Sequence, residues 1–164
     1  LGMPANERMD SMVEKATELG AATIQPLVCE RSVLRLAGDR AERKAAHWQA
    51  VAIAACEQSG RNRVPRVASP VALRDWLAAM ESDSQSERLM LSLDAQAQPL
   101  LRQLSASSQA PLVFLSGPEG GLSRAEQALA GQHGFQPVTL GPRTLRADTA
   151  PLAALACIAA LEGR

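Results

Sequence analysis

Aromatic side chains are almost absent from this sequence. The 164 residues include two Trp, two Phe and no Tyr, and aromatic residues make up 2% of the chain. These rings all fall in segments expected to be helix or strand, so a surface on which nucleic-acid bases stack against aromatic rings is not expected. Any recognition of a nucleic acid then has to rest on phosphate contacts and on a base turned out of its stack.

Patterns typical of membrane, secreted and metal-binding proteins are missing too. No apolar run approaches the roughly 20 residues that a spanning helix needs, and no signal-peptide pattern opens the chain. Cys29, Cys56 and Cys157 are widely spaced in apolar or helical contexts, which favours reduced thiols over disulfides or a zinc cluster. The sequence therefore predicts a cytoplasmic protein with no metal ion and no membrane contact.

The glycine motifs and the charge balance indicate whether the chain could be a nucleotide-binding enzyme or a nucleic-acid-binding protein. Neither G-x-G-x-x-G nor G-x-x-x-x-G-K-[ST] occurs, which disfavours dinucleotide-binding and P-loop enzymes. The formal net charge is zero, whereas a nucleic-acid-binding domain usually carries a basic excess. Between positions 31 and 66, however, eight basic residues accompany three acidic ones. Such a patch can bind phosphates by releasing counterions, and a solvated surface with scattered arginine is the other interpretation.

Apolar periodicity and capping residues predict alternating helices and strands. The expected helices span 6–19, 40–59, 69–80 and 100–104, and the expected strands span 23–28, 88–93, 112–115 and 136–140. Trp48, Val51, Ala52 and Ala55 form one face of the second helix. This alternation predicts an α/β fold, a parallel sheet with helices on both faces. With 46% hydrophobic residues, the segment 1–164 is expected to form one domain.

Two glycine-rich turns follow the last two expected strands. The first, 115–123 (LSGPEGGLS), leads into a capping box of Ser123 and Glu126, so its adjacent glycines lie where backbone N–H groups can face a ligand. The second, 140–151 (LGPRTLRADTAP), leads into the last helix. We expect these turns to lie side by side at the ends of neighbouring parallel strands, where open α/β sheets bind ligands.

The last helix is apolar on every side. Residues 152–161 read LAALACIAAL, whereas a surface helix should show one polar face. Burial within one small domain would explain this composition, but burial between two subunits is the favoured interpretation because such small side chains let helices approach closely.

The two turns resemble the second and third motifs of the SPOUT RNA methyltransferases. Within that superfamily they are similar to the family that methylates the N3 nitrogen of a uridine in 16S ribosomal RNA. Other segments match that family in order and approximate spacing: 15–20 (KATELG), 26–27 (PL), 30–32 (ERS), 57–61 (EQSGR) and 64–65 (VP). The resemblance covers essentially the whole chain. It implies a trefoil knot near the C-terminus, a homodimer formed through that region, and a β-rich RNA-binding domain that this chain is expected to lack.

The resemblance also implies that S-adenosylmethionine is the cofactor, bound largely through backbone groups. The residues implied to bind it are Leu115, Ser116, Gly117, Glu119, Gly121, Leu140, Gly141, Leu145, Arg146 and Ala150. Asp148 departs from the family's commonest pattern, in which a glutamate is more usual. That difference leaves the role of its carboxylate open.

The implied reaction places a methyl group on uracil N3, which first has to lose its proton. An arginine can stabilise the ring anion, because its guanidinium stays charged and its fork matches adjacent carbonyl oxygens. The predicted catalytic residues are Arg31, Arg61, Arg146 and Glu18. Glu119 and Asp148 are alternatives to Glu18 as the proton acceptor.

Two other functions stay open at this level. A SPOUT enzyme could act on an RNA other than 16S ribosomal RNA of the small subunit, because one fold serves many substrates. Alternatively, the chain could be a non-catalytic module that binds RNA or a nucleotide through the same turns. His47 and His133 are expected to be structural, since both fall within expected helices.

Overall fold

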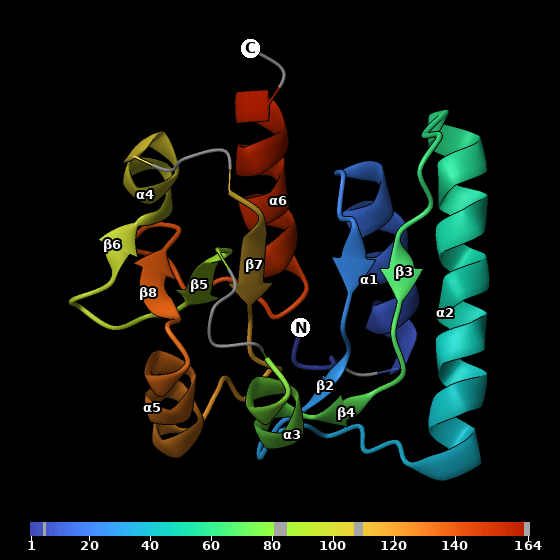
Figure 1. Cartoon of the computed structure of the whole chain (residues 1–164), viewed down its shortest axis with the longest axis horizontal. Coiled ribbons are helices and arrows are strands. Elements are labelled where there is room, and N and C mark those ends of the chain that lie inside the picture. The colour runs from blue at the N-terminus through green and yellow to red at the C-terminus, as the bar shows by residue number, and fades with distance from the viewer. Residues whose placement is uncertain (5, 81–84, 107–109, 163–164) are drawn as a thin grey trace.

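Two groups of elements lie side by side in the computed structural model, which describes residues 1–164 except 5, 81–84, 107–109 and 163–164 (Figure 1). The helices are α1 (Asn6–Glu18), α2 (Gly38–Ser59), α3 (Leu73–Ala78), α4 (Leu100–Ala106), α5 (Arg124–Gln132) and α6 (Thr149–Glu162). The strands are β1 (Thr23–Ile24), β2 (Leu27–Val28), β3 (Arg66–Val67), β4 (Val71–Ala72), β5 (Glu87–Leu91), β6 (Gln98–Pro99), β7 (Leu112–Leu115) and β8 (Gln136–Thr139).

The larger sheet is parallel and has the strand order β6-β8-β5-β7. Leu89 of β5 lies opposite Phe114 of β7 and Gln136 of β8, so β5 is flanked by the two strands that lead into the glycine-rich turns. The prediction that those turns follow neighbouring strands was therefore wrong. Strand β5 is the most buried strand of the sheet, and its three central residues, 88–90, are all buried.

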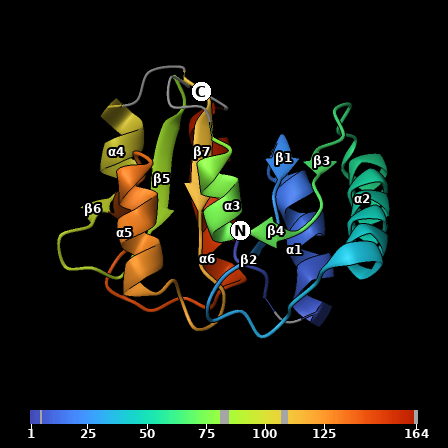
Figure 2. The ribbon, with the colours of Figure 1, turned by 60° about the horizontal axis from the view of Figure 1, so that its bottom comes forward.

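Helices cover both faces of this sheet, as the alternation of elements predicted (Figure 2). Leu89 and Met90 are adjacent on β5 and point to opposite faces, because side chains alternate along a strand. Leu89 belongs to a core cluster with residues of α4 and α6, whereas Met90 belongs to one with residues of α3 and α5. The α/β class with helices on both faces is thus confirmed.

The other group of elements packs α1 and α2 around a fully buried tryptophan. Trp48 of α2 is 0% exposed, and its Nε1 donates a 2.9 Å hydrogen bond to Asp10 Oδ1 of α1. Two short parallel pairs, β1 with β3 and β2 with β4, lie beside these helices. Leu152 and Leu155 of α6 pack against the same core and so join this group to the larger sheet.

The structure differs from the sequence prediction in a few short segments. The strand expected over 23–28 is split at Pro26, which has no N–H to donate, so that β1 and β2 pair with different partners. The helix expected from 69 begins only at Leu73, because β4 pairs with β2 and is held extended. Strands β3 and β6 have two residues each, too few to show a periodic pattern.

Candidate functional site

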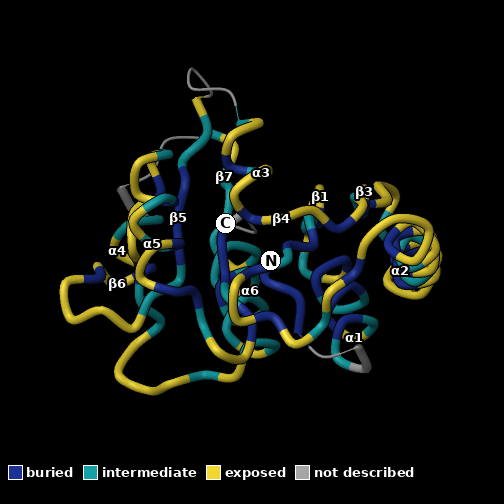
Figure 3. The backbone as a smooth tube through the Cα atoms, turned by 90° about the horizontal axis from the view of Figure 1, so that it is seen from below, coloured by how far each residue is buried: buried dark blue, intermediate teal, exposed yellow. Residues whose placement is uncertain are grey.

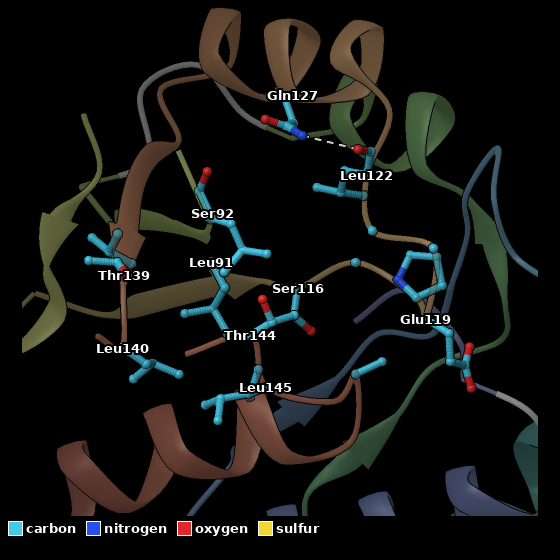
Figure 4. Close-up of a pocket in the computed structure, with 18 of the residues that line it drawn as sticks. Leu91, Ser92, Ser116, Glu119, Leu122, Gln127, Thr139, Leu140, Thr144 and Leu145 are labelled. Carbon is cyan, nitrogen blue, oxygen red and sulfur yellow. Dashed lines mark hydrogen bonds between the residues drawn. The ribbon is translucent and has the colours of Figure 1, made fainter. Parts of the chain in front are cut away.

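A pocket opens at the carboxyl ends of β5, β7 and β8, the edge at which parallel α/β sheets bind ligands (Figure 4). Its cavity volume is about 350 Å³, which is within the range of small-molecule sites. Most of its lining comes from the end of β5, the turn between β7 and α5, and the turn between β8 and α6. Both glycine-rich turns therefore contribute to one cavity.

The first turn depends on glycine at two positions. A Cβ on Gly117 would lie 2.7 Å from the backbone nitrogen of Leu122, so the chain approaches itself this closely only without a side chain. Gly121 has a φ of +67°, in the left-handed region that glycine adopts most easily. A Cβ on Gly121 would meet no described protein atom within 4 Å, and this residue lines the pocket. The main chain is thus open to a ligand there.

A buried carboxylate fixes the end of this turn. Glu126 Oε2 accepts a 2.8 Å hydrogen bond from the Ser123 N–H, and Ser123 Oγ accepts one from the Glu126 N–H, which confirms the predicted capping box. Glu126 Oε1 also accepts a 2.8 Å hydrogen bond from the Glu30 N–H in the segment after β2. Burial raises the pKa of the nearby Cys29 thiol to about 11, and the charge of Glu126 adds to the shift. This thiol is therefore protonated at neutral pH.

The second turn is held open in a similar way. Gly141 has a φ of +116°, its N–H donates to Thr139 Oγ1 over 3.2 Å, and a Cβ there would meet nothing within 4 Å. At the far end of the turn, the N–H groups of Thr149 and Ala150 both donate 3.0 Å hydrogen bonds to the carbonyl oxygen of Arg146. These bonds close the turn onto the first residues of α6.

Most residues implied to bind the cofactor line this pocket. Eight of the ten do so: Ser116, Gly117, Glu119, Gly121, Leu140, Gly141, Leu145 and Ala150. Leu115 does not, because its side chain is fully buried in the core between the sheet, α3 and α5. Arg146 is exposed and contributes its carbonyl oxygen to the turn without lining the cavity.

Other lining residues were not singled out from the sequence. Leu91, Ser92 and Leu93 stand at the end of β5, and Gln127 of α5 donates a 3.0 Å hydrogen bond to the Leu122 carbonyl oxygen (Figure 4). The available signal was the expected strand over 88–93, since the carboxyl ends of parallel strands share an edge. What the sequence did not show is that this strand lies between the other two.

The predicted catalytic residues are not all brought together. Arg31 lines the pocket, and its Nη1 donates a 2.9 Å hydrogen bond to the Gly120 carbonyl oxygen. Its Cδ would lie 3.3 Å from a Cβ placed on Gly120, so the aliphatic part of the side chain lies against this turn. Arg31 thus brings a positive charge from the segment after β2 to the cavity.

Arg61 and Glu18 lie outside the residues that line the pocket. The Arg61 guanidinium donates hydrogen bonds of 2.8–2.9 Å to the carbonyl oxygens of Thr17, Gly20 and Ala21. These carbonyls are at the C-terminal end of α1, where a helix leaves its last acceptors without intrahelical partners. Glu18 forms an ion pair with a lysine one turn earlier on the same helix.

One cation lies between two carboxylates of the different turns. Arg8 Nη1 is 3.6 Å from Glu119 Oε1, and Arg8 Nε is 3.9 Å from Asp148 Oδ2. Arg8 belongs to α1, whereas Glu119 and Asp148 belong to the first and second turns respectively. All three side chains are about one-third exposed, so solvent screens these ion pairs and they contribute little to stability.

Neither of the two histidines lines the pocket. His47 Nε2 lies 2.8 Å from Asp10 Oδ2, and the His133 carbonyl oxygen accepts a 2.8 Å hydrogen bond from Arg88. Among the described residues, no three His, Cys, Asp or Glu side chains form a group that could hold a metal ion. None of the described helices combines the length and apolar character that crossing a membrane requires.

A parallel sheet with a glycine-lined pocket at its carboxyl edge is the arrangement in which open α/β proteins bind small ligands. Residues 1–159 match the sequence model of a protein family that is described as "RNA methyltransferase domain". The chain belongs to that family, and the family resemblance seen in the sequence is confirmed.

Similar proteins carry a more specific name. Ribosomal RNA small subunit methyltransferase E of Synechocystis sp. is 38% identical over 98% of this chain and 52% of its own length. The protein of that name from Bacillus subtilis is 37% identical over 96% of this chain and 62% of its own length. A crystal structure of this enzyme from Neisseria gonorrhoeae, bound to S-adenosyl methionine, has a TM-score of 0.85 and 41% identity, covering 98% of this chain and 64% of that one. This chain thus spans between 52% and 64% of the length of these three proteins.

Proposed function

We propose that this chain carries the catalytic site of an S-adenosylmethionine-dependent methyltransferase that modifies uracil N3 of one uridine in 16S ribosomal RNA. Its membership of the RNA methyltransferase family and the names of its relatives support this proposal. The enzyme would act in the cytoplasm on the small ribosomal subunit. The implied trefoil knot stays a prediction.

One observation carries the proposal: Gly121 and Gly141 present open main chain to the same pocket. Both have a left-handed φ, and a Cβ on either would meet no described protein atom within 4 Å. Between these turns, Leu91, Leu140 and Leu145 provide apolar surface (Figure 4). Apolar side chains beside exposed backbone donors and acceptors suit a flat, polar-edged ring such as adenine. The residues present therefore fit S-adenosylmethionine.

When bound, S-adenosylmethionine supplies an electrophilic methyl group attached to a positively charged sulfur. The protein has to hold the uracil in line with that methyl group, which is worth about 7–11 kcal/mol in well-oriented reactions. It also has to remove the N3 proton. These two tasks define the roles of the polar groups at the pocket.

Arg31 is the arginine that we propose for stabilising the uracil anion, because it lines the pocket. A guanidinium has five N–H donors, and the hydrogen bond to Gly120 uses one of them. The others can face the uracil carbonyl oxygens on either side of N3 and stabilise the negative charge that they share. Arg61, in contrast, is committed to carbonyl oxygens at the end of α1.

Glu119 is the carboxylate that we propose as proton acceptor. It lines the pocket, whereas Glu18 lies elsewhere on α1. A carboxylate oxygen of Glu119 would accept the N3 proton, which leaves the N3 electron pair available for the methyl group that the cofactor would supply. Arg8 Nη1, 3.6 Å from Glu119 Oε1, is the cation that faces this carboxylate.

We also propose a homodimer formed through α6. Within 149–161, Ala154 is the one described residue that this chain buries, and Ala156 and Ala160 are exposed although the helix is apolar (Figure 3). Leu152 and Leu155 pack against the α1 and α2 core, and Ala154 and Cys157 pack against the sheet, so the side of α6 that carries Ala156 and Ala160 is left uncovered. A second copy would cover it, because small side chains allow close helix packing.

Two measurements test the proposed function. Calorimetric titration of the protein with S-adenosylhomocysteine should show binding, and a dimeric sample without heat of binding would favour a non-catalytic RNA-binding module. Labelled methyl groups should then be transferred by the whole enzyme to 16S RNA within assembled small ribosomal subunits. Label on transfer RNA instead would identify an enzyme with a different RNA substrate.

A further inference from the structure

Residues 31–35 form an irregular segment, with a turn at 30–31 and a bend at 33, at the same end of the molecule as the pocket. Figure 2 shows the chain between β2 and α2 running along the same edge as the turn between β7 and α5, and the hydrogen bond from Arg31 to Gly120 joins the two. Exposure alternates along this segment. Arg31, Val33 and Arg35 are exposed, whereas Ser32 is buried and Leu34 packs against the α1 and α2 core. Three exposed side chains, two of them arginines, thus stand within five residues of chain, and the first of them lines the pocket.

Val33 is an unusual side chain to find in this position. It is 80% exposed, more than any other exposed large hydrophobic residue that the structure describes. Its neighbour is firmly anchored, because Ser32 Oγ accepts a 3.0 Å hydrogen bond from the Cys29 N–H and the Ser32 N–H donates to the Cys29 carbonyl oxygen over 3.1 Å. A fixed frame thus presents a branched apolar group to solvent, beside a residue that lines the pocket.

The charges on either side of Val33 are positive. Arg31 Nη1 donates to the Gly120 carbonyl oxygen, and Arg35 Nη2 donates over 3.2 Å to the Glu30 carbonyl oxygen. Both contacts are to neutral backbone acceptors, so they orient the guanidiniums without cancelling their charge. Along the chain the segment therefore presents a cation, an apolar group and a second cation, and the first of these lines the pocket.

We propose that Arg31, Val33 and Arg35 form the edge that grips the substrate RNA beside the methylated uridine. This inference rests on the proposed function. The Arg35 guanidinium binds a phosphate beside the target, Arg31 faces the uracil in the pocket, and Val33 packs into the stack beside the base that has turned into the pocket. Nucleic-acid-binding proteins use apolar side chains as wedges between bases in this way.

An RNA strand fits this edge better than a second copy of the chain does. In a two-fold dimer the same patch meets itself, which would bring the arginines of two copies together. The partly uncovered apolar helix α6 offers a dimer surface without that repulsion. The positive charges beside Val33 complement phosphates instead.

The first test uses Val33→Asp and Val33→Ala in the whole enzyme, assayed on assembled small ribosomal subunits. We expect the KM for subunits to rise at least about tenfold for Val33→Asp and about threefold for Val33→Ala, because the wedge is charged or shortened. The dissociation constant for S-adenosylhomocysteine and the dimeric state should not change. Ile53→Asp is the matched control: Ile53 is 44% exposed on α2 and does not line the pocket.

A second variant tests the charge. Arg35→Gln should weaken binding to the small ribosomal subunit. In a plot of log affinity against log salt concentration, the magnitude of the slope should fall by about one, as expected for the loss of one phosphate contact. An unchanged KM in both Val33 variants, or an unchanged salt slope in Arg35→Gln, would overturn the proposal. So would conversion of Val33→Asp to a monomer, which would mean that a second copy covers Val33.

The unmodified enzyme shows whether a negative result concerns the RNA edge or the proposed function. If the unmodified enzyme neither binds S-adenosylhomocysteine nor methylates subunits, the proposed function itself is wrong. If it does both and the Val33 and Arg35 variants match it, only the RNA edge is wrong.

Discussion

Arg31 Nη1 donates a 2.9 Å hydrogen bond to the carbonyl oxygen of Gly120, a residue 89 positions further along the chain. The contact is close along the side chain as well, since a Cβ on Gly120 would lie 2.9 Å from Arg31 Cβ. Gly120 is not among the glycines with a positive φ, so its backbone conformation does not require glycine. Its lack of a side chain instead leaves room for the Arg31 side chain. The first turn and the segment after β2 thus fit together through a glycine.

Replacing Gly120 by alanine should therefore displace Arg31 without straining the turn. We expect kcat for RNA methylation to fall by about tenfold or more, because a misplaced donor no longer stabilises the uracil anion. The dissociation constant for S-adenosylhomocysteine should change little. Steady-state kinetics and calorimetry on the same preparation give both values, and an equal loss in both would mean that the variant disturbs the whole turn.

Gly121→Val should abolish cofactor binding, with an affinity loss of about a hundredfold or more, because a branched side chain would occupy the open space at the pocket. Gly60→Val is the matched control. Gly60 ends α2 with a φ of +70°, also has open space at its Cβ position, and lies outside the pocket. Both variants should lose about 1–2 kcal/mol of folding free energy through backbone strain. Calorimetry should show normal binding of S-adenosylhomocysteine by Gly60→Val alone.

Local sequence signals predicted local structure well. The strand over 112–115 and the capping box of Ser123 and Glu126 appear as expected, because each depends on residues within a few positions of one another. Contacts over long separations were out of reach. Nothing in the sequence indicates that β5 lies between β7 and β8, or that Glu126 also binds the Glu30 N–H, since both depend on how the packed elements meet.

Arg61 shows the same limit at a candidate site residue. It was a predicted catalytic arginine because a guanidinium can stabilise the uracil anion, and the structure shows it hydrogen-bonded to carbonyl oxygens at and just after the end of α1. An arginine at a binding surface and one that caps a helix look alike in sequence. Only the folded position of its guanidinium distinguishes the two, because the carbonyls that it binds lie 40 or more residues earlier in the sequence.

Arg61→Ala should accordingly lower stability. Losing its hydrogen bonds to carbonyl oxygens should cost about 2–3 kcal/mol, which corresponds to roughly 4–12 °C in Tm for a domain of this size. Thermal unfolding measures the shift, and Arg61→Lys should recover part of it. We expect kcat per folded molecule to be unchanged. A large loss of kcat at constant Tm would instead support the catalytic role predicted from the sequence.

Glu126→Gln should also destabilise the protein, but at the junction between the two groups of elements. Its carboxylate accepts from the N–H groups of Ser123 and Glu30, and an amide can replace only one of its two oxygens as an acceptor. Leaving a buried donor unpaired costs about 1–3 kcal/mol. Chemical denaturation should show this loss, and Ser123→Ala, which removes one capping contact and keeps the link to Glu30, should lose less. Equal losses would mean that the link to Glu30 contributes nothing.

Ala156→Glu tests the proposed dimer through α6. Ala156 is exposed on a helix that has no charged residue between 149 and 161, so a carboxylate there would be buried without a partner when two copies meet. Sedimentation should then show a monomer, whereas Ala50→Glu, at an exposed position of the polar-faced α2, should sediment as a dimer. Because the same helix begins at the second turn of the pocket, monomers should also bind S-adenosylhomocysteine less tightly. A monomer that binds it normally would show that the pocket is complete within one chain.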